Sequence, residues 1–435
     1  MQKTAVIGMG KTGCSIVSFL LSQGIECDAF DENNIDLDPS LTCRLYCGPL
    51  QAQQLEAYDS LALSPGISWQ HPVLQQLRSQ GKKMLSDLEL FAQHFKGDTI
   101  AITGTNGKTT VTTLLHQLMN IPALGNIGTP MLDALADQHS QAVLELSSFQ
   151  LQRSAPIHSK YAVLLNLQPD HVDMHADAEE YKQAKLRVFA KQQQGDWAML
   201  PADHEWDEQA NRLQKRGVCV RRVGGTSPHT DVGIRQSDQG NTVFWQQGQY
   251  SMPCADIAIQ GSHQYLNLAI VAQIATDLDQ DQEKIIHMMH HFSGLPHRMQ
   301  YVGHYHGRDW FNDSKATNPD AAIAALQSCQ KVTWICGGLR KGIDLTPMTK
   351  TVAQHVDHAW VIGTEPEAYV AMLQEAGVSY QVVGHLAAAV TAAKAANNKL
   401  PVLLSPASAS MDQFLNYAER GEVFMELAKA EVSQT

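Results

Sequence analysis

One glycine-rich loop of the chain carries residue types that bind phosphate. It consists of Gly104, Thr105, Asn106, Gly107, Lys108, Thr109 and Thr110. In such a loop, backbone N–H groups surround the phosphates, a lysine reaches the β- and γ-phosphates, and a hydroxyl binds Mg²⁺. Lys108 and Thr109 supply the last two, although Ile102 stands where the standard loop has its first glycine. The alternative is an ordinary strand–helix turn, but the apolar segment before the loop and the helical pattern after it favour phosphate binding.

Two further residues with metal-binding side chains follow predicted strands. Glu145 ends the segment AVLE, and its carboxylate could share Mg²⁺ with Thr109 and the phosphates. His171 lies beside Asp170 after the segment YAVLLNL, and a neutral imidazole can bind a metal ion or a phosphate. Each also has a simpler interpretation, because a lone glutamate at a strand end is usually a surface residue and a single histidine is weak support for a site.

Two other clusters of lysines and histidines are typical of solvent-exposed helix faces rather than of a catalytic or metal site. Lys182 and Lys185 stand one helical turn apart, and composition alone favours a solvated helix face for them. His287, His290 and His291 cluster on a predicted helix without the glutamate that the H-x-x-E-H zinc pattern requires. We therefore interpret the histidine cluster as a polar helix face.

The last third of the sequence contains three polar loops, each after a predicted strand. Their candidate residues are Asp313, Lys315, Thr317, Lys341, Ser408 and Ser410. Backbone N–H groups at a helix start attract an anion, and lysines nearby favour a carboxylate. The segment SPASASMDQF places its serines just before a predicted helix. Helix capping explains a single loop equally well, but three loops in one unit favour a pocket for an anionic substrate.

A repeated strand–loop–helix pattern must position these residues. We predict an α/β fold with three domains: a Rossmann-like unit over residues 1–88, a central P-loop ATPase-like parallel sheet over 89–296, and a Rossmann-like unit over 297–435. In parallel sheets, functional groups gather at the carboxyl ends of the strands. This arrangement would bring the polar loops of each unit together.

The first unit raises a competing hypothesis. Gly8 to Gly13 read GMGKTG, which matches G-x-G-x-x-G between an apolar strand and a helical segment, and Asp31 follows further on. This pattern is typical of dinucleotide binding and suggests an NAD-dependent oxidoreductase. That hypothesis leaves the Gly104 loop and the third unit unexplained. A P-loop regulator or motor without bond-forming chemistry is a further alternative.

Composition narrows the class of protein. The 435 residues carry a formal net charge of −12, which argues against a general nucleic-acid binder. No apolar run is long enough to cross a bilayer, and the N-terminal segment lacks the pattern of a signal peptide. The eight cysteines show neither C-x-x-C nor zinc spacing, so we expect buried thiols in a reducing compartment. The expectation is a cytoplasmic protein, which we take to be a monomer.

Ten segments, in order, resemble the Mur ligase family, and within it the members that add D-glutamate. They run from residue 8 to residue 421 and read GMGKTG, SPGI, TGTNGKTT, GNIG, LELSSFQL, NLQPDHVDMH, AKLRVF, GLPHRM, NDSKATNPDA and SPASASMDQFLNYAERG. The resemblance implies an ATP-dependent amide ligase of peptidoglycan precursor synthesis. In that reaction ATP phosphorylates the carboxylate of UDP-N-acetylmuramoyl-L-alanine, and the amine of D-glutamate displaces the phosphate. Mg²⁺, with two ions implied, and Lys108 would neutralise the transferring phosphoryl group.

The resemblance also implies roles for individual residues. Catalysis is assigned to Lys108, Glu145, His171 and Lys185, and metal binding to Thr109, Glu145, His171 and Lys185, with Lys185 carrying a CO₂-derived carbamate. ATP is assigned to the loop Gly104 to Thr110 and to Asn267, Arg298 and Asp313. The UDP substrate is assigned to Gly10, Thr12, Asp31, Ser64, Gly66 and Asn126. D-Glutamate is assigned to Lys315, Thr317, Lys341, Ser410 and Tyr417.

Three departures from the family pattern accompany the resemblance. The loop GGLRK at 337–341 lacks an acidic residue that the family often has, Tyr417 stands where phenylalanine is common, and Gln264 stands where some members have asparagine. Another Mur ligase or a folylpolyglutamate-type ligase is the nearest alternative within the same chemistry.

Overall fold

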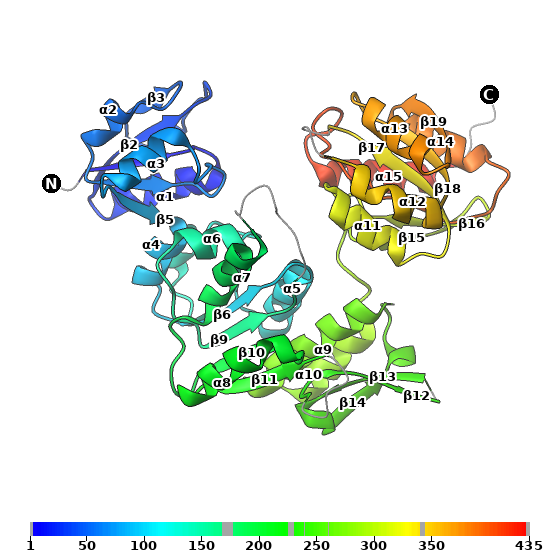
Figure 1. The fold of residues 1–435 in the computed structure, drawn as a ribbon, viewed down its shortest axis with the longest axis horizontal. Helices are drawn as coiled ribbons and strands as arrows, with labels where there is room; N and C mark the ends of the chain where they lie inside the picture. Colours follow the sequence, from blue (N-terminus) through cyan, green and yellow to red (C-terminus); the bar gives the residue numbers. More distant parts are fainter. Residues whose placement is uncertain are drawn as a thin grey trace. The chain divides into compact units, whose positions relative to one another are not determined.

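The computed structural model describes residues 3–167, 177–224, 230–238, 240–259, 261–339 and 344–431. The chain divides into two units, Met1–Phe292 and Ser293–Thr435, and Figure 1 shows the elements of each. Both units are built on parallel sheets flanked by helices, so the predicted α/β class is confirmed. His171 and Lys341, which the sequence singled out, lie outside the described residues.

The first sheet of the first unit has five parallel strands in the order β3-β2-β1-β4-β5. The strands are β1 (Lys3–Ile7), β2 (Glu26–Asp31), β3 (Leu45–Cys47), β4 (Ser60–Leu63) and β5 (Lys83–Ser86). The helices are α1 (Lys11–Ser22), α2 (Ala52–Glu56), α3 (Pro72–Ser79) and α4 (Asp87–His94). The chain moves from β1 to opposite sides of the sheet, so the loops after β1 and β4 flank a topological switch point, where α/β sheets bind ligands.

The second sheet has six parallel strands in the order β11-β10-β9-β6-β8-β7. The strands are β6 (Asp98–Thr103), β7 (Ala123–Gly125), β8 (Gln141–Glu145), β9 (Tyr161–Leu164), β10 (Trp197–Pro201) and β11 (Cys219–Val223). The helices that follow in this part of the chain are α5 (Lys108–Met119), α6 (Ser148–Arg153), α7 (Ala178–Leu186), α8 (Asp207–Lys215), α9 (Ser262–Asp277) and α10 (Gln282–His291). β6 is the switch strand here, with β8 on one side and β9 on the other.

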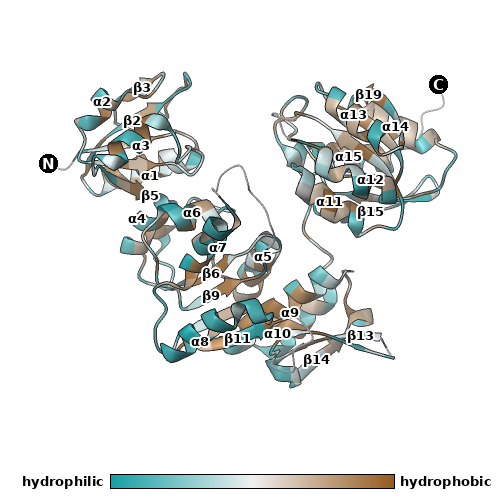
Figure 2. Ribbon diagram, viewed as in Figure 1, coloured by the Kyte–Doolittle hydropathy of each residue, from teal (hydrophilic) through white to brown (hydrophobic). Residues whose placement is uncertain are grey.

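A small antiparallel sheet, β12-β13-β14, packs beside α9. Its strands are β12 (Gly233–Ser237), β13 (Gly240–Trp245) and β14 (Tyr250–Pro253). One hydrophobic core includes Val6 of the first sheet together with Leu144 and Ala162 of the second, which explains why both sheets belong to one unit. Figure 2 shows β6 and β9 in brown and the outer helix α8 in teal, as burial of a parallel sheet requires.

The second unit contains a six-stranded sheet in the order β15-β16-β20-β17-β18-β19. Only the β15–β16 pair is antiparallel among its described strand pairs. The strands are β15 (Gln300–Tyr305), β16 (Arg308–Asn312), β17 (Val332–Gly337), β18 (Val356–Ile362), β19 (Ser379–Gly384) and β20 (Val402–Leu404). The helices are α11 (Pro319–Gln327), α12 (Thr349–His355), α13 (Glu367–Glu375), α14 (Leu386–Ala395) and α15 (Tyr417–Lys429). Buried tryptophans fill both faces, with Trp334 on one and Trp310 on the other.

The cysteines and helices test two expectations from composition. All eight cysteines are free thiols, but Cys47 and Cys219 are exposed, so the expectation that the thiols are buried is wrong for these two. Their strands β3 and β11 lie at sheet edges, where one side of the strand has no neighbour in the sheet. In the described part of the chain, the helices are all too short or too polar to cross a bilayer.

The two glycines at the start of α1 make a matched pair for mutation. A Cβ atom on Gly13 would lie 1.9 Å from the carbonyl oxygen of Gly8, whereas a Cβ on Gly10 would meet nothing within 4 Å. Gly13→Ala should therefore destabilise the first unit by about 1–3 kcal/mol, because the β1–α1 turn must move. Gly10→Ala should leave the melting temperature close to that of the wild type. Equal melting temperatures for the two variants would contradict this account of the turn.

Candidate active site

The loop between β6 and α5 needs glycine at two positions because other residues approach it closely. Gly104 has φ +151°, and a Cβ there would lie 2.9 Å from the Cβ of Leu165. Gly107 has φ +87°, and a Cβ there would lie 2.6 Å from Oδ1 of Asn267 on α9. The predicted phosphate loop and the predicted ATP residue Asn267 are thus neighbours, brought together from two distant helices.

The side-chain amide of Asn166, just after β9, holds the open loop in shape. Its Oδ1 accepts hydrogen bonds from the backbone N–H groups of Asn106 at 2.8 Å and Thr105 at 3.1 Å, and its Nδ2 donates to the carbonyl of Asn106 at 3.0 Å. Sequence analysis missed Asn166. One feature of the sequence could have indicated it: Asn166 carries a polar amide directly after β9, the strand next to β6 at the switch point.

Two lysines converge on one backbone oxygen of this loop. Nζ of Lys108 and Nζ of Lys185 each donate to the carbonyl of Gly104 at 2.8 Å. Lys185 is only 1% exposed and its Nζ lies 4.6 Å from the ring centroid of Tyr181, so the interpretation as a solvated helix face is wrong for this residue. The side chains of both lysines therefore end at the predicted phosphate loop, where the positive charge of a lysine attracts phosphate oxygens.

Lys182, one turn before Lys185, has a different environment. Its Nζ pairs with Glu205 at 2.5 Å and lies 4.9 Å from the ring centroid of Trp206 at the outer side of α7. The two lysines that look alike in the sequence are therefore separated by the rotation of the helix, and only Lys185 reaches the glycine loop.

Glu145 provides a buried carboxylate at the end of β8. Its side chain is 2% exposed, so the alternative of a surface strand end is wrong. Oε1 accepts from Nδ2 of Asn126 at 3.1 Å, while Oε2 is buried without a hydrogen-bond partner among the described residues. Buried polar atoms normally have a partner, and a buried carboxylate oxygen without one suits a hard cation such as Mg²⁺.

The register of the sheet places Glu145 beside the loop. Glu145 pairs with Ile102 of β6, and the next residue, Leu146, donates its N–H to the carbonyl of Ile102 at 2.9 Å. Asn126, predicted for the UDP substrate, is tied to Glu145 through its side chain and through its N–H, which donates to the carbonyl of Glu145 at 2.9 Å. Residues predicted for two different ligands thus meet at one sheet edge.

The first sheet, with its loops and α1, carries the residues predicted for the UDP substrate other than Asn126. Asp31 accepts from the N–H of Met9 at 2.8 Å and of Asn33 at 2.9 Å. Partial burial acts to raise the pKa of Asp31, but these hydrogen bonds outweigh it and lower the pKa below the ordinary value. A Cβ on Gly8 would lie 2.7 Å from the side chain of Ile67, so the loop after β1 packs directly against the loop containing Ser64 and Gly66.

In the second unit, Asp313 is buried directly after β16. Its Oδ2 accepts from Oγ of Ser405 at 2.7 Å and its Oδ1 from the N–H of Met299 at 3.1 Å. Burial raises the pKa of Asp313 to about 7, against the lowering effects of these two hydrogen bonds and of the nearby Arg298 charge. Arg298 and Asp313 lie in the second unit and Asn267 in the first, so each unit carries part of the predicted ATP set.

The residues predicted for D-glutamate also lie in the second unit. Nζ of Lys315 lies 3.9 Å from the ring centroid of Tyr417, which is the first residue of α15. Ser410 is buried, and its carbonyl accepts from the N–H groups of Gln413 and Phe414 in a turn. The expectation that Ser408 and Ser410 stand just before a helix is wrong, because the turn and the cap residue Asn416 intervene before α15.

A buried arginine that sequence analysis missed connects these loops. Arg420, 1% exposed, donates to the side-chain and backbone oxygens of Ser314 at 2.9 Å and to the carbonyl of Ser408 at 3.1 Å. Burial lowers the pKa of Arg420 to about 10. It fixes the loop after β16 to the loop after β20, and thereby orients Lys315 and Ser410 indirectly.

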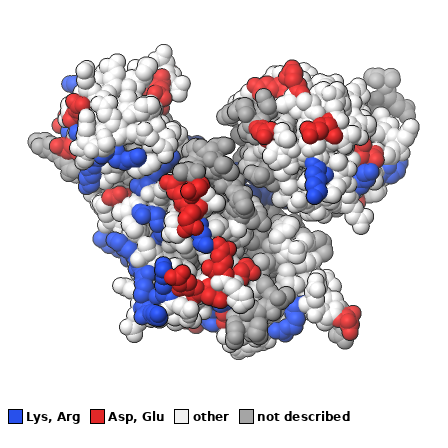
Figure 3. Space-filling view, viewed as in Figure 1, with Lys and Arg blue, Asp and Glu red and all other residues white. Residues whose placement is uncertain are grey.

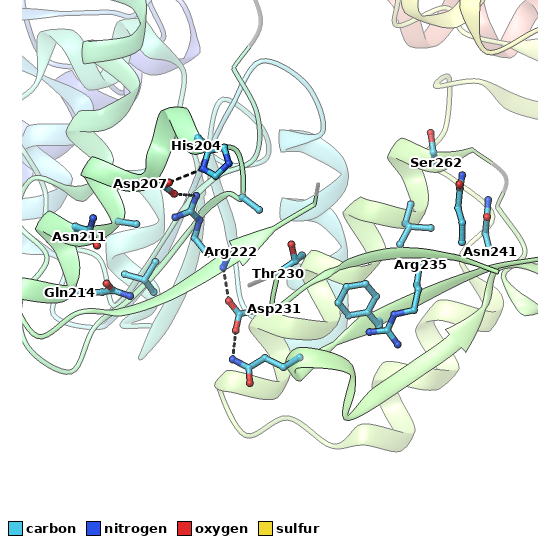
Figure 4. Close-up of a pocket in the computed structure, with 17 residues that line it drawn as sticks. His204, Asp207, Asn211, Gln214, Arg222, Thr230, Asp231, Arg235, Asn241 and Ser262 are labelled. Carbon is cyan, nitrogen blue, oxygen red and sulfur yellow. Dashed lines mark hydrogen bonds and ion pairs between the residues drawn. The ribbon is translucent and has the colours of Figure 1, made fainter. Parts of the chain in front are cut away.

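A cavity of about 1240 Å³ lies away from these residues, between α8 and the β12–β13 sheet (Figure 4). Four of its polar residues bind one another: Asp207 pairs with His204 and Arg222, and the N–H of Arg222 donates to Asp231. The guanidinium of Arg235 lies over the ring of Phe244. In Figure 3, basic and acidic side chains occur in neighbouring small groups on the face drawn, without a continuous basic surface there. The exposed histidines of α10 form no cluster of three metal-binding side chains within the described residues.

Comparison with known proteins gives the family. The chain is 35% identical to the UDP-N-acetylmuramoylalanine–D-glutamate ligase of Methylobacillus flagellatus, over 99% of this chain and 98% of that one. It is 34% identical to the ligase of the same name from Pseudomonas syringae pv. tomato, over 96% of each chain. The chain belongs to the Mur ligase family. Within that family, it matches the MurD-like N-terminal domain over residues 2–86, the Mur ligase middle domain over 102–275 and the glutamate ligase domain over 297–408.

Solved structures show that the fold is shared as well. The UDP-N-acetylmuramate–alanine ligase MurC of Thermotoga maritima superposes with a TM-score of 0.61 at 17% identity, over 98% of this chain and 99% of that one. The three-domain Mur ligase fold predicted from the sequence is therefore confirmed.

The buried carboxyl of Asp313 predicts a pH dependence of stability. Because its pKa is about 7 in the folded protein and 3.8 is the ordinary value, the folded state binds the proton more tightly, and stability falls as pH rises from about 4 to 7. The loss is on the order of 4 kcal/mol. Asp313→Asn should remove this loss of stability, because asparagine does not ionise. The variant should therefore be more stable than the wild type at pH 8 and lose this advantage near pH 4. Hydrogen exchange of β16 and β17 measures the difference, and a difference that does not change with pH would contradict the assignment.

Proposed function

We propose that this Mur ligase joins D-glutamate to UDP-N-acetylmuramoyl-L-alanine with the hydrolysis of ATP, as the names of its relatives state for those proteins. The observation that best supports this proposal is that the side chains of Lys108 and Lys185 both reach the Gly104 carbonyl in the phosphate loop, while the neighbouring strand β8 ends at the buried carboxylate of Glu145. This arrangement suits the transfer of a phosphoryl group to a carboxylate, because both reactants are anions that must be brought together.

The glycine loop is proposed to hold the phosphates of ATP. Its N–H groups and Lys108 would bind the β- and γ-phosphate oxygens and stabilise the charge on the transferring group, leaving the substrate carboxylate free to attack phosphorus. The acyl phosphate that results has a good leaving group. The amine of D-glutamate then attacks the carbonyl carbon, and inorganic phosphate departs as the amide bond forms.

The residues around the loop fit Mg²⁺. Oε2 of Glu145 and the hydroxyl of Thr109 are the oxygen donors that this ion prefers, and its charge would screen the phosphates from the substrate carboxylate. His171 is proposed for a second ion. Lys185 is proposed to carry the carbamate, which converts its buried ammonium group into an anion able to accept a cation or a hydrogen bond.

The remaining assignments divide by domain. Residues 1–88 are proposed to bind the UDP substrate, through Gly10, Thr12, Asp31, Ser64 and Gly66 with Asn126 from the next domain. Residues 89–296 are proposed to bind ATP, with Arg298 and Asp313 contributing from the last domain. Residues 297–435 are proposed to bind D-glutamate, through Lys315, Thr317, Lys341, Ser410 and Tyr417. We further propose that the protein acts in the cytoplasm as a monomer.

The family relationship weighs against the oxidoreductase hypothesis drawn from Gly8 to Gly13, because the MurD-like N-terminal domain itself spans this motif. The loop's phosphate-binding character then serves the diphosphate of a UDP-sugar. A regulator or motor is disfavoured for the same reason, since all three matched domains are those of a ligase.

A phosphate-release assay with each substrate omitted in turn tests the function. Release should require ATP, UDP-N-acetylmuramoyl-L-alanine and D-glutamate together, and omission of any one should reduce it to background. A panel of amino acids then tests specificity within the ligase class. Clear preference for L-alanine, meso-diaminopimelate or L-glutamate on a folate would reject the D-glutamate assignment, and retention of NADH without binding of the UDP substrate would restore the oxidoreductase hypothesis.

Lys185 and Lys182 provide a matched test of the proposed carbamate. Lys185→Ala should lower kcat by about 100-fold or more, because it removes a buried group at the phosphate loop, and added short-chain carboxylates should restore part of the activity. Lys182→Ala removes the outer contacts with Glu205 and Trp206 and should retain near wild-type turnover. Unchanged activity of Lys185→Ala, or equal losses in both variants, would reject the role of Lys185.

A further inference from the structure

Arg153, the last residue of α6, reaches from the second sheet to a loop of the first. Its Nη1 donates to the carbonyl of Ile67 at 2.8 Å and to the carbonyl of Pro65 at 3.1 Å. These two carbonyls flank Gly66, in the loop that the proposed function assigns to the UDP substrate. We infer that Arg153 is a positioning residue for this loop, which it holds in the conformation that binds the substrate diphosphate.

The planarity of the peptide bond explains how a contact behind the loop shapes its binding face. In a trans peptide the C=O and the following N–H point in opposite directions. Because the carbonyls of Pro65 and Ile67 point to Arg153, the N–H groups of Gly66 and Ser68 point away from it. Neither N–H has a hydrogen-bond acceptor among the described residues, and a Cβ on Gly66 would meet nothing within 4 Å. Both residues are exposed, so these two donors are accessible to an anionic ligand.

The positive charge of Arg153 also favours the binding of an anion by this loop. A guanidinium bound to both carbonyls polarises the loop peptides and makes their N–H groups better donors to phosphate oxygens. Arg153 forms no ion pair with a carboxylate in the described part of the chain, so its charge is not neutralised by a neighbouring side chain there. Asp87 lines the same small cavity without pairing with it.

Aromatic rings fix the guanidinium in place. It lies 5.7 Å from the ring centroid of Phe149 and 5.8 Å from that of Trp69, while Arg78 lies 4.5 Å from the same tryptophan ring. Cation–π contacts of this kind hold an arginine without neutralising it. Arg78 therefore shares the aromatic neighbour of Arg153 but donates no hydrogen bond to the loop, which makes it a matched control.

The same residue links the loop to the candidate metal ligand. α6 starts soon after Glu145, and Ser147 and Gln150 close its N-terminus with a reciprocal capping box. Glu145 and Arg153 thus lie on one short, capped segment. The segment fixes the UDP-binding loop relative to the position where the other end of the substrate would be phosphorylated.

Arg153→Met tests the inference, because methionine retains the apolar contacts with the aromatic rings and removes the donors and the charge. The dissociation constant of UDP and the KM for UDP-N-acetylmuramoyl-L-alanine should each rise about ten-fold, because the loop loses the two charge-assisted hydrogen bonds that hold it. The KM values for ATP and D-glutamate and kcat should remain within about two-fold of wild type. Arg153→Lys should recover part of the affinity, and Arg78→Met should bind UDP as the wild type does.

Three results would overturn the inference: unchanged UDP affinity in Arg153→Met, an equal rise in all three KM values, or the same loss in Arg78→Met. If Arg153→Met does not fold, Arg153→Gln gives the same test, since it replaces the guanidinium by a polar amide without the charge. UDP binding by calorimetry does not depend on turnover. A wild type that binds UDP but fails to release phosphate with D-glutamate would therefore reject the proposed function without deciding the role of Arg153.

Discussion

The carbonyl oxygen of Gly104 accepts hydrogen bonds from the ammonium groups of both Lys108 and Lys185. The Lys185 group is buried, and burying a charge costs free energy unless hydrogen bonds and opposite charges stabilise it. Contacts from other parts of the second sheet hold the loop that supplies this oxygen. Asn166 holds the loop through three hydrogen bonds, and glycines allow close packing against Leu165 and Asn267. Glu145, at the end of the neighbouring strand β8, has a buried oxygen without a hydrogen-bond partner among the described residues.

The topology of the second sheet produces this convergence. β6 lies between β8 and β9, so three loops from separate parts of the sequence leave the sheet at the same edge. Each loop contributes a different chemical group: N–H groups and lysine after β6, a carboxylate at the end of β8, and an amide after β9. The first sheet also brings loops from separate parts of the sequence together at its switch point. There the loops after β1 and β4 pack against each other through Gly8 and Ile67.

How much the sequence could predict depended on the range of the interactions. The strand–loop–helix around Lys108 is local, and its pattern alone predicted the phosphate loop. Asn166 and Arg420 act on residues far away in the sequence, so no local spacing revealed them. Lys185 and Lys182 look equivalent in sequence because only the packing of α7 against the loop decides which face is buried.

Motifs and spacing also do not show how a side chain is held in the folded protein. The nucleotide-binding role of Asp313 stays a prediction. The motif does not indicate that its carboxyl group is buried and accepts hydrogen bonds from Ser405 and Met299. Ser408 and Ser410 were placed at a helix start from their spacing, whereas a turn separates them from α15. Arg153 belongs to no motif that the sequence singled out, and only its two contacts with the loop after β4 reveal it.

The central claim is that the Lys108 loop brings the γ-phosphate of ATP to the substrate carboxylate. The most direct test uses UDP-N-acetylmuramoyl-L-alanine labelled with ¹⁸O in the alanine carboxylate and follows the label by mass spectrometry during turnover with ATP and D-glutamate. An acyl phosphate requires one carboxylate oxygen to leave with the phosphate, so the inorganic phosphate should carry one ¹⁸O atom for each amide formed. Amide product accompanied by unlabelled phosphate would contradict the account.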